Sequence, residues 1–165
     1  MANSGEFVSE SLTILIQNTL WAGVAALGFA ILFNVPPRTL ILAAICGAAG
    51  YAVRSWLVQS GAIGVEMATL VAAIVVSLLG LLFGRRWHAP PVVFVIPGVI
   101  PLVPGAQAFR TMIDILVLTT DGVQVNQTIL TTTAANAIKT LLIVGAIASG
   151  IAVPSLLLRR HRPMM

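Results

Sequence analysis

The sequence predicts an all-α integral membrane protein of about five transmembrane helices, the fourth of which is broken. Of its 165 residues, 58% are hydrophobic and only 8% are charged, whereas soluble domains contain about 25% charged residues. The mean hydropathy is +1.02, which leaves too few polar side chains to cover a soluble surface. The hydrophobic residues also form runs of about 20, the length that a helix needs to cross a bilayer.

Five such runs follow one another in a single membrane domain, residues 1–165. We expect spans at roughly residues 12–33, 39–58, 63–83, 91–120 and 130–158. Asn34-Val35-Pro36-Pro37-Arg38 ends the first span, because its prolines cannot continue a helix. Gly84-Arg85-Arg86-Trp87-His88 follows the third. A count of four spans stays open if the broken fourth segment only dips into the membrane.

The fourth span contains three prolines and two glycines, in Pro97-Gly98-Val99-Ile100-Pro101-Leu102-Val103-Pro104-Gly105. Backbone groups freed inside a bilayer find no water, so each unsatisfied group costs several kcal/mol, roughly. Transporters tolerate such breaks where the freed backbone lines a cavity, and build substrate sites there near the bilayer midplane. The break therefore indicates transport, with a kink that only shapes packing as the alternative.

Basic residues predict the orientation of the chain. With five spans, one side of the membrane holds Arg38, Arg85, Arg86, Arg159, Arg160 and Arg162 and no acidic residue. Lysine and arginine collect in cytoplasmic loops, so we expect the N-terminus outside and the C-terminus in the cytoplasm. These charges lie at the ends of apolar runs and not in a patch. Membrane lipid is therefore an expected partner, and nucleic acid is not.

The sequence contains no motif of a known catalytic or cofactor site. His-Glu-x-x-His, Gly-x-Ser-x-Gly and P-loop sequences are all absent. Cys46 is the single cysteine, which excludes an intrachain disulfide and a cysteine-based metal site. We expect no enzymatic activity, no cofactor and no metal. Any pumping must draw on an ion gradient or on a separate subunit.

Two stretches of the chain resemble the small subunit of the bacterial threonine/serine exporter family. They are Asn34-Val35-Pro36-Pro37-Arg38 and Pro101-Leu102-Val103-Pro104-Gly105-Ala106-Gln107-Ala108-Phe109-Arg110. Arg54 at the end of the second span and Glu66 at the start of the third add to the resemblance. Pro97-Gly98 departs from the family pattern, because it adds a second break ahead of the motif.

The resemblance implies a split, two-part exporter in the bacterial inner membrane, with a larger membrane subunit as partner. The implied small-molecule substrates are threonine and serine, or dicarboxylates such as succinate. Two such halves would form inverted repeats, with the substrate at their interface. Freed carbonyls at the break suit a substrate ammonium, and amides near residues 106–108 suit a carboxylate. An amino acid carries both groups.

The expected substrate path follows the broken span. It consists of Pro101, Pro104, Gly105, Gln107, Arg110, Thr111 and Asp114. Arg110 and Asp114 are spaced i, i+4 and can pair on one helix face. Arg110 is expected to bind a substrate carboxylate, while Asp114 balances its charge or carries a proton. A self-neutralising pair at the outer interface is the alternative.

Four further residues are candidates for a gate or for ion coupling, namely Arg54, Glu66, Asn136 and Lys139. Arg54 and Glu66 flank one outer turn, where they form a gate or an interfacial salt bridge. A lysine at the position of Lys139 most often extends toward the membrane surface, with substrate binding beside Asn136 as the alternative. Protonation of Asp114 or Glu66 is the expected coupling step.

Small residues recur at a spacing of four, which lets helices approach closely in lipid. The pairs are Ala22 and Ala26, Ala43 and Gly47, Cys46 and Gly50, Gly145 and Ser149, and Ala146 and Gly150. They serve packing within the chain or docking onto a partner. Two functions stay open beside the exporter, a non-transporting accessory or assembly subunit and a small homo-oligomeric channel.

Overall fold

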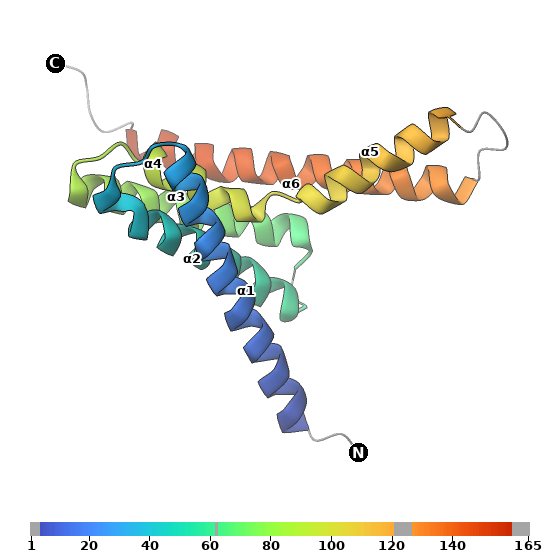
Figure 1. Cartoon of the computed structure of the whole chain (residues 1–165), viewed down its shortest axis with the longest axis horizontal. Coiled ribbons are helices and arrows are strands. Elements are labelled where there is room, and N and C mark those ends of the chain that lie inside the picture. The colour runs from blue at the N-terminus through green and yellow to red at the C-terminus, as the bar shows by residue number, and fades with distance from the viewer. Residues whose placement is uncertain (1–3, 62, 121–126, 160–165) are drawn as a thin grey trace.

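The computed structural model describes residues 4–61, 63–120 and 127–159, which fold into helices joined by short turns (Figure 1). The helices are α1 (Ser4–Leu32), α2 (Leu40–Gln59), α3 (Val65–Trp87), α4 (Val92–Val99), α5 (Gly105–Thr120) and α6 (Gln127–Arg159). Two short 3-10 helices, η1 (Pro37–Thr39) and η2 (Ile100–Leu102), precede α2 and follow α4. These ranges contain no β-strand.

Within the described ranges, four helical segments are long and apolar enough to cross a membrane. They are Leu12–Leu32, Pro37–Gln59, Val65–Trp87 and Leu130–Leu156. Val92–Leu102 and Gly105–Val117 make a fifth crossing if this pair, bent by 55°, is one span. The predicted fold class is thereby confirmed, including the position of the break.

Helices α1 to α4 form a packed group. The second half of the broken span, α5, lies outside this group. α2 packs against α1 and α3, and α4 lies against all three of these helices. α6 runs along α3, while α5 has α6 as its main neighbour. In Figure 1 α5 and the part of α6 beside it extend to the right, away from the other helices, while the rest of α6 runs along α3. The break thus separates a half-span held by the bundle from a half-span held by α6.

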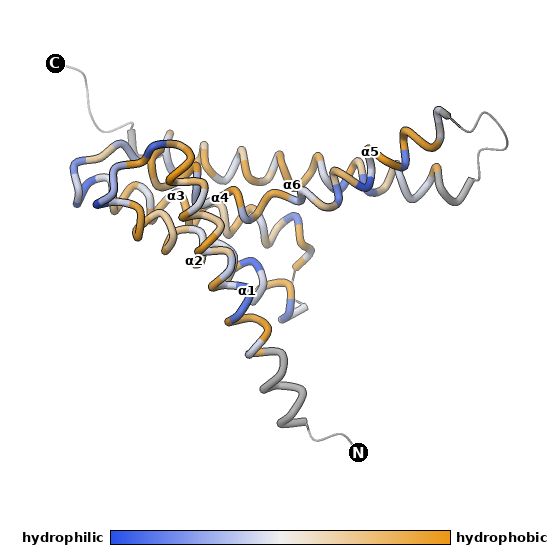
Figure 2. Tube along the Cα trace, in the orientation of Figure 1, coloured by the Kyte–Doolittle hydropathy of each residue, from blue (hydrophilic) through white to orange (hydrophobic). Residues whose placement is uncertain are grey.

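The ends of the helices alternate as an odd number of spans requires. The α1–α2 turn, the α3–α4 turn and the end of α6 lie together at the left of Figure 1. This end carries Arg38 in η1 and Arg85 and Arg86 in the last turn of α3. Figure 2 shows hydrophilic residues gathered at these turns and hydrophobic residues along most of each span.

Small residues hold the helices close together. Most of the pairs expected from the sequence are buried, namely Ala22, Ala26, Ala43, Cys46, Gly47, Gly50, Ala146 and Gly150. A Cβ atom on Gly47 would overlap Ala26, and one on Gly150 would lie 2.6 Å from the Cβ of Ala73. Gly145 and Ser149 are exposed. The buried pairs therefore pack the bundle internally, and the exposed pair faces lipid or another chain.

Candidate functional site

The first half of the broken span, α4, is buried among α1, α2 and α3. Phe94, Pro97 and Gly98 are among its buried residues. A Cβ atom on Gly98 would lie 2.9 Å from the Cβ of Cys46 on α2 and 2.9 Å from Cγ1 of Val76 on α3. Real Cβ atoms do not approach other atoms so closely, so glycine is needed here. The Pro97-Gly98 break thus lets the backbone of α4 touch both neighbours.

The second break is a 3-10 turn followed by one extended residue. η2 is followed by Val103, whose φ is −66° and ψ is 129°. The N–H of Val103 donates to the Ile100 carbonyl, and the N–H of Gly105 donates to the Val103 carbonyl. Because Pro101 and Pro104 have no N–H, the helical ladder cannot run through this segment. α5 starts at Gly105 in a new direction.

Arg54 on α2 binds a carbonyl that this break leaves without a helical donor. Its Nη1 atom donates a 2.8 Å hydrogen bond to the carbonyl oxygen of Leu102. In a continuous helix that carbonyl would accept the N–H of Ala106, four residues later. The hydrogen bond is partly buried, so the guanidinium replaces water that would reach this carbonyl only in part. The guanidinium therefore supplies the hydrogen bond that the Leu102 carbonyl lacks. It also links α2 to the second break, which we call the hinge.

A pocket of about 270 Å³ lies beside Arg54. Its lining is Tyr51, Arg54, Ser55, Val58 and Gln59 of α2, with Val65 of α3. Tyr51, Ser55 and Gln59 recur every four residues and so share one face of α2. Sequence reasoning missed this set, although a polar stripe at helical spacing in an apolar span was the available signal.

Glu66 does not neutralise Arg54. It stands in the first turn of α3, where its Oε2 atom approaches Gly64, the residue that precedes the helix. A carboxylate is stabilised at that position by the helix dipole. Both side chains belong to the described part of the chain, and no ion pair joins them. The partner of the guanidinium is the Leu102 carbonyl.

The expected path residues divide at the break. Pro101 and Pro104 are partly buried at the hinge, whereas Gly105, Gln107 and Arg110 are exposed on α5. Thr111 is buried, and its hydroxyl donates to the Gln107 carbonyl at 2.9 Å. Asp114 is partly buried. The structure, which describes both side chains, shows no ion pair between Arg110 and Asp114.

The remaining candidates lie on α6. Asn136 is partly buried and accepts a 2.8 Å hydrogen bond from the Thr140 hydroxyl through its carbonyl, whereas Lys139 is exposed. Thr133, one helical turn before Asn136, is buried with no hydrogen-bond partner for its Oγ1 atom. In the described residues, no three His, Cys, Asp or Glu side chains come together as a metal site would need.

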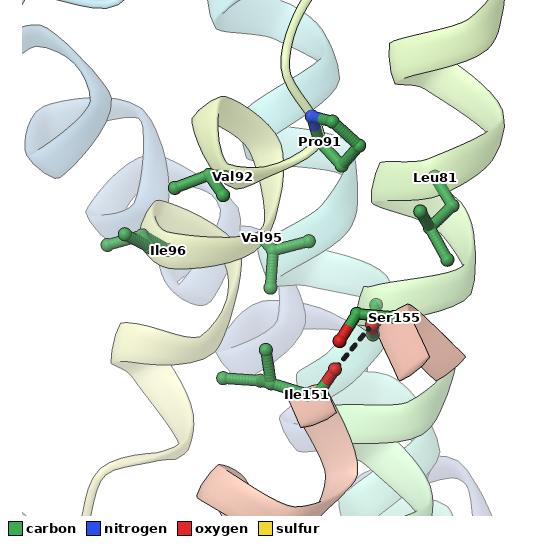
Figure 3. Close-up of a pocket in the computed structure, with 8 residues that line it drawn as sticks. Leu81, Pro91, Val92, Val95, Ile96, Ile151 and Ser155 are labelled. Carbon is green, nitrogen blue, oxygen red and sulfur yellow. Dashed lines mark hydrogen bonds between the residues drawn. The ribbon is translucent and has the colours of Figure 1, made fainter. Parts of the chain in front are cut away.

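A second pocket of about 220 Å³ lies between α3, α4 and α6 (Figure 3). Its polar groups include the hydroxyls of Ser77 and Ser155, and Ser77 donates a 3.3 Å hydrogen bond to the Ile151 carbonyl. Its other walls are apolar, with Val95 and Ile96 projecting from α4 (Figure 3). Among the side chains that the structure describes, those that line this pocket are all uncharged, which distinguishes it from the pocket at Arg54.

The comparison with known families identifies the chain. The profile of the family described as "Threonine/Serine exporter, ThrE" matches residues 18–157. The matched range includes Arg54, both breaks of the fourth span and the whole of α2 to α5. No solved structure matches this chain. The resemblance seen in the proline motifs is thus confirmed, and the chain belongs to the threonine/serine exporter family.

Proposed function

We propose that this chain is the small subunit of a secondary exporter that works with a larger membrane subunit. Its substrates are small polar acids, either amino acids of the threonine and serine type or dicarboxylates such as succinate. The observation that supports this function is the broken fourth span, whose freed Leu102 carbonyl is bound by Arg54 inside the bundle. Broken spans that expose backbone at a binding site are a recurrent device of secondary transporters.

The structure suggests where movement takes place. α4 is fixed by close contacts with α2 and α3. α5 has lost the continuous hydrogen-bond ladder at η2 and has α6 as its main neighbour. In alternating access α5 would move about the break, while α1 to α4 and the part of α6 that packs on α3 stay together. Transporters of the inverted-repeat type move one bundle against another around a fixed site in this way.

The exposed face of α5 supports the need for a partner. Phe109, Met112 and Leu116 are 65%, 72% and 65% exposed, and the polar Gln107 and Arg110 are exposed beside them. An arginine that faces lipid within a span is costly. We infer that the larger subunit covers this face, so that Gln107 and Arg110 border a path between the two halves.

The chain would lie in the bacterial inner membrane, with the N-terminus outside. The arginines at the α1–α2 and α3–α4 turns then face the cytoplasm. Export would be coupled to the proton motive force, with Asp114 or Glu66 as the group that carries the proton. If Asp114→Asn and Glu66→Gln both export normally at every pH gradient, this coupling proposal fails.

The test is efflux of preloaded threonine, serine and succinate from cells. Cells express this chain alone, the larger subunit alone, or both together. We expect efflux only with both chains, and its loss in Arg110→Ala at unchanged membrane levels. Leu141→Ala, at an exposed apolar position of α6, is the control that should keep activity. No efflux of any of the three compounds with both chains in the membrane would favour an accessory role, and conductance by this chain alone would favour a channel.

A further inference from the structure

Arg54 brings a positive charge into the last two turns of an apolar helix without a counter-charge from the described part of this chain. It is partly buried, and the partner of its side chain is the Leu102 carbonyl, which is neutral. A cation away from bulk water is stabilised only when an anion or several dipoles compensate it. Glu66 does not pair with it, and the acidic Asp114 lies on α5, whose main neighbour is α6.

The guanidinium has donors left for a ligand. An arginine side chain presents five N–H groups in a rigid planar fork, and one of them is used by Leu102. The fork matches the two oxygens of a carboxylate, which makes arginine well suited to binding that group. The remaining donors are therefore available to an anion in the adjoining pocket.

The pocket offers further hydrogen-bonding groups around that charge. The Tyr51 and Ser55 hydroxyls donate or accept, and the Gln59 amide does both, while Val58 and Val65 supply apolar walls. Drug-sized ligands occupy pockets of about 300–1,000 Å³. A hollow of about 270 Å³ suits a smaller metabolite with one acidic end, one or two polar groups and a short carbon chain.

We propose that this pocket binds the carboxylate of a small organic acid, with Arg54 as the residue that receives it. This rests on the proposed function, because the acid is taken to be the exported substrate. The same guanidinium donates to the Leu102 carbonyl. A carboxylate that accepts hydrogen bonds from this guanidinium therefore acts directly on the hinge of the broken span. Arg110, exposed on the far side of that hinge, serves a later position on the path.

The experiment measures binding of radiolabelled threonine and succinate to the full-length protein, purified in detergent with any subunit that accompanies it. Threoninamide, which lacks the carboxylate, is the competitor. Arg54→Gln keeps an amide N–H on a shorter side chain but removes the charge and the fork. Tyr51→Phe and Ser55→Ala leave the Arg54 bond to Leu102 untouched. Arg38→Gln, the same chemical change at an exposed residue of η1, is the matched control.

We expect Arg54→Gln to weaken binding of one of the acids at least tenfold. Tyr51→Phe or Ser55→Ala should weaken it several-fold, Arg38→Gln should bind normally, and threoninamide should not compete. Equal affinity in Arg54→Gln, or no binding of either acid to the wild type, would overturn the proposal. A second result would also overturn the proposal: Arg54→Gln loses part of the accompanying subunit, while the complexes that remain intact bind the acids with unchanged affinity. That result would assign the counter-charge of Arg54 to a carboxylate of that subunit.

The outcome is separable from that of the efflux test. If both chains export threonine and Arg54→Gln binds it as well as the wild type does, the exporter function is supported and the carboxylate site at Arg54 is overturned. If the acids bind through Arg54 while no efflux occurs, the pocket stands and the exporter does not.

Discussion

The Nη1 atom of Arg54 lies 2.8 Å from the carbonyl oxygen of Leu102, although the two residues are 48 positions apart in the chain. The contact joins the second span to the point where the fourth span breaks. It replaces the helical hydrogen bond from the Ala106 N–H to the Leu102 carbonyl. The extended backbone at Val103, which precedes a proline, prevents that bond. A charged side chain therefore stabilises the irregular backbone on which the proposed transport mechanism depends.

Removing this hydrogen bond should destabilise the fold. In Arg54→Met the Leu102 carbonyl loses its donor in a partly buried setting, and a buried unsatisfied group costs about 1–3 kcal/mol. Unfolding by sodium dodecyl sulfate in mixed micelles, followed by circular dichroism, measures the change. Arg38→Met should unfold like the wild type, since Arg38 is exposed in η1. Equal stability of the two variants would show that the bond contributes little.

The close approach at Gly98 should make that position intolerant of a side chain. In Gly98→Ala the new methyl group meets Cys46 and Val76, and overpacking of this kind costs about 1–3 kcal/mol. Thermal unfolding in detergent is the measurement. Gly145→Ala is the matched control, because nothing lies within 4 Å of its added Cβ and alanine favours helices by about 1 kcal/mol. A destabilisation of the same size in both variants would contradict the packing argument.

The prolines at the second break should set the bend. In the double variant Pro101→Ala with Pro104→Ala the N–H groups return, so we expect the fourth span to straighten from its 55° bend. Spin labels at Ile96 and Val117, two exposed positions, should then move apart in pulsed electron-spin distance measurements, in a Cys46→Ala background. Efflux should fall because the Leu102 carbonyl regains a helical donor. An unchanged distance would mean that tertiary packing, and not proline, holds the bend.

The proposed orientation can be read by labelling single cysteines in intact cells, again in a Cys46→Ala background. A membrane-impermeant maleimide should label Gln59→Cys, at the end of α2, from outside. Arg38→Cys, in the turn before α2, should react only after the cells are permeabilised. Both positions are exposed, so access of the reagent to the side of the membrane decides the result. The reverse pattern would place the N-terminus in the cytoplasm.

Local properties of the chain explain why so much of the fold could be predicted. A run of about 20 apolar residues has few alternatives to a membrane span, and the helices long and apolar enough to span lie near the expected ranges. Proline removes an N–H wherever it stands, so the break at Pro101 to Gly105 was visible in advance. The small residues of α2 were likewise expected to allow close packing, and Gly47 and Gly50 do so.

The site was harder to predict, since it depends on how helices are rotated against one another. Arg54 and Glu66 flank one turn, which made an ion pair the natural expectation. The rotation of α2 instead turns the guanidinium toward η2, and Glu66 stays at the start of α3. For the same reason the sequence did not reveal that one freed carbonyl, that of Leu102, is bound by a side chain of the protein itself.

The sequence by itself determined that this is a helical membrane protein, where its spans lie, where the fourth one breaks and to which family it is similar. These follow from composition, from the length of apolar runs and from the chemistry of proline. Only the tertiary structure decided that Arg54 binds Leu102, that Gly98 is wedged against Cys46 and Val76, and that α5 leaves the bundle. Such contacts join residues far apart in the chain, and their geometry is set by the packing of whole helices, which no local pattern encodes.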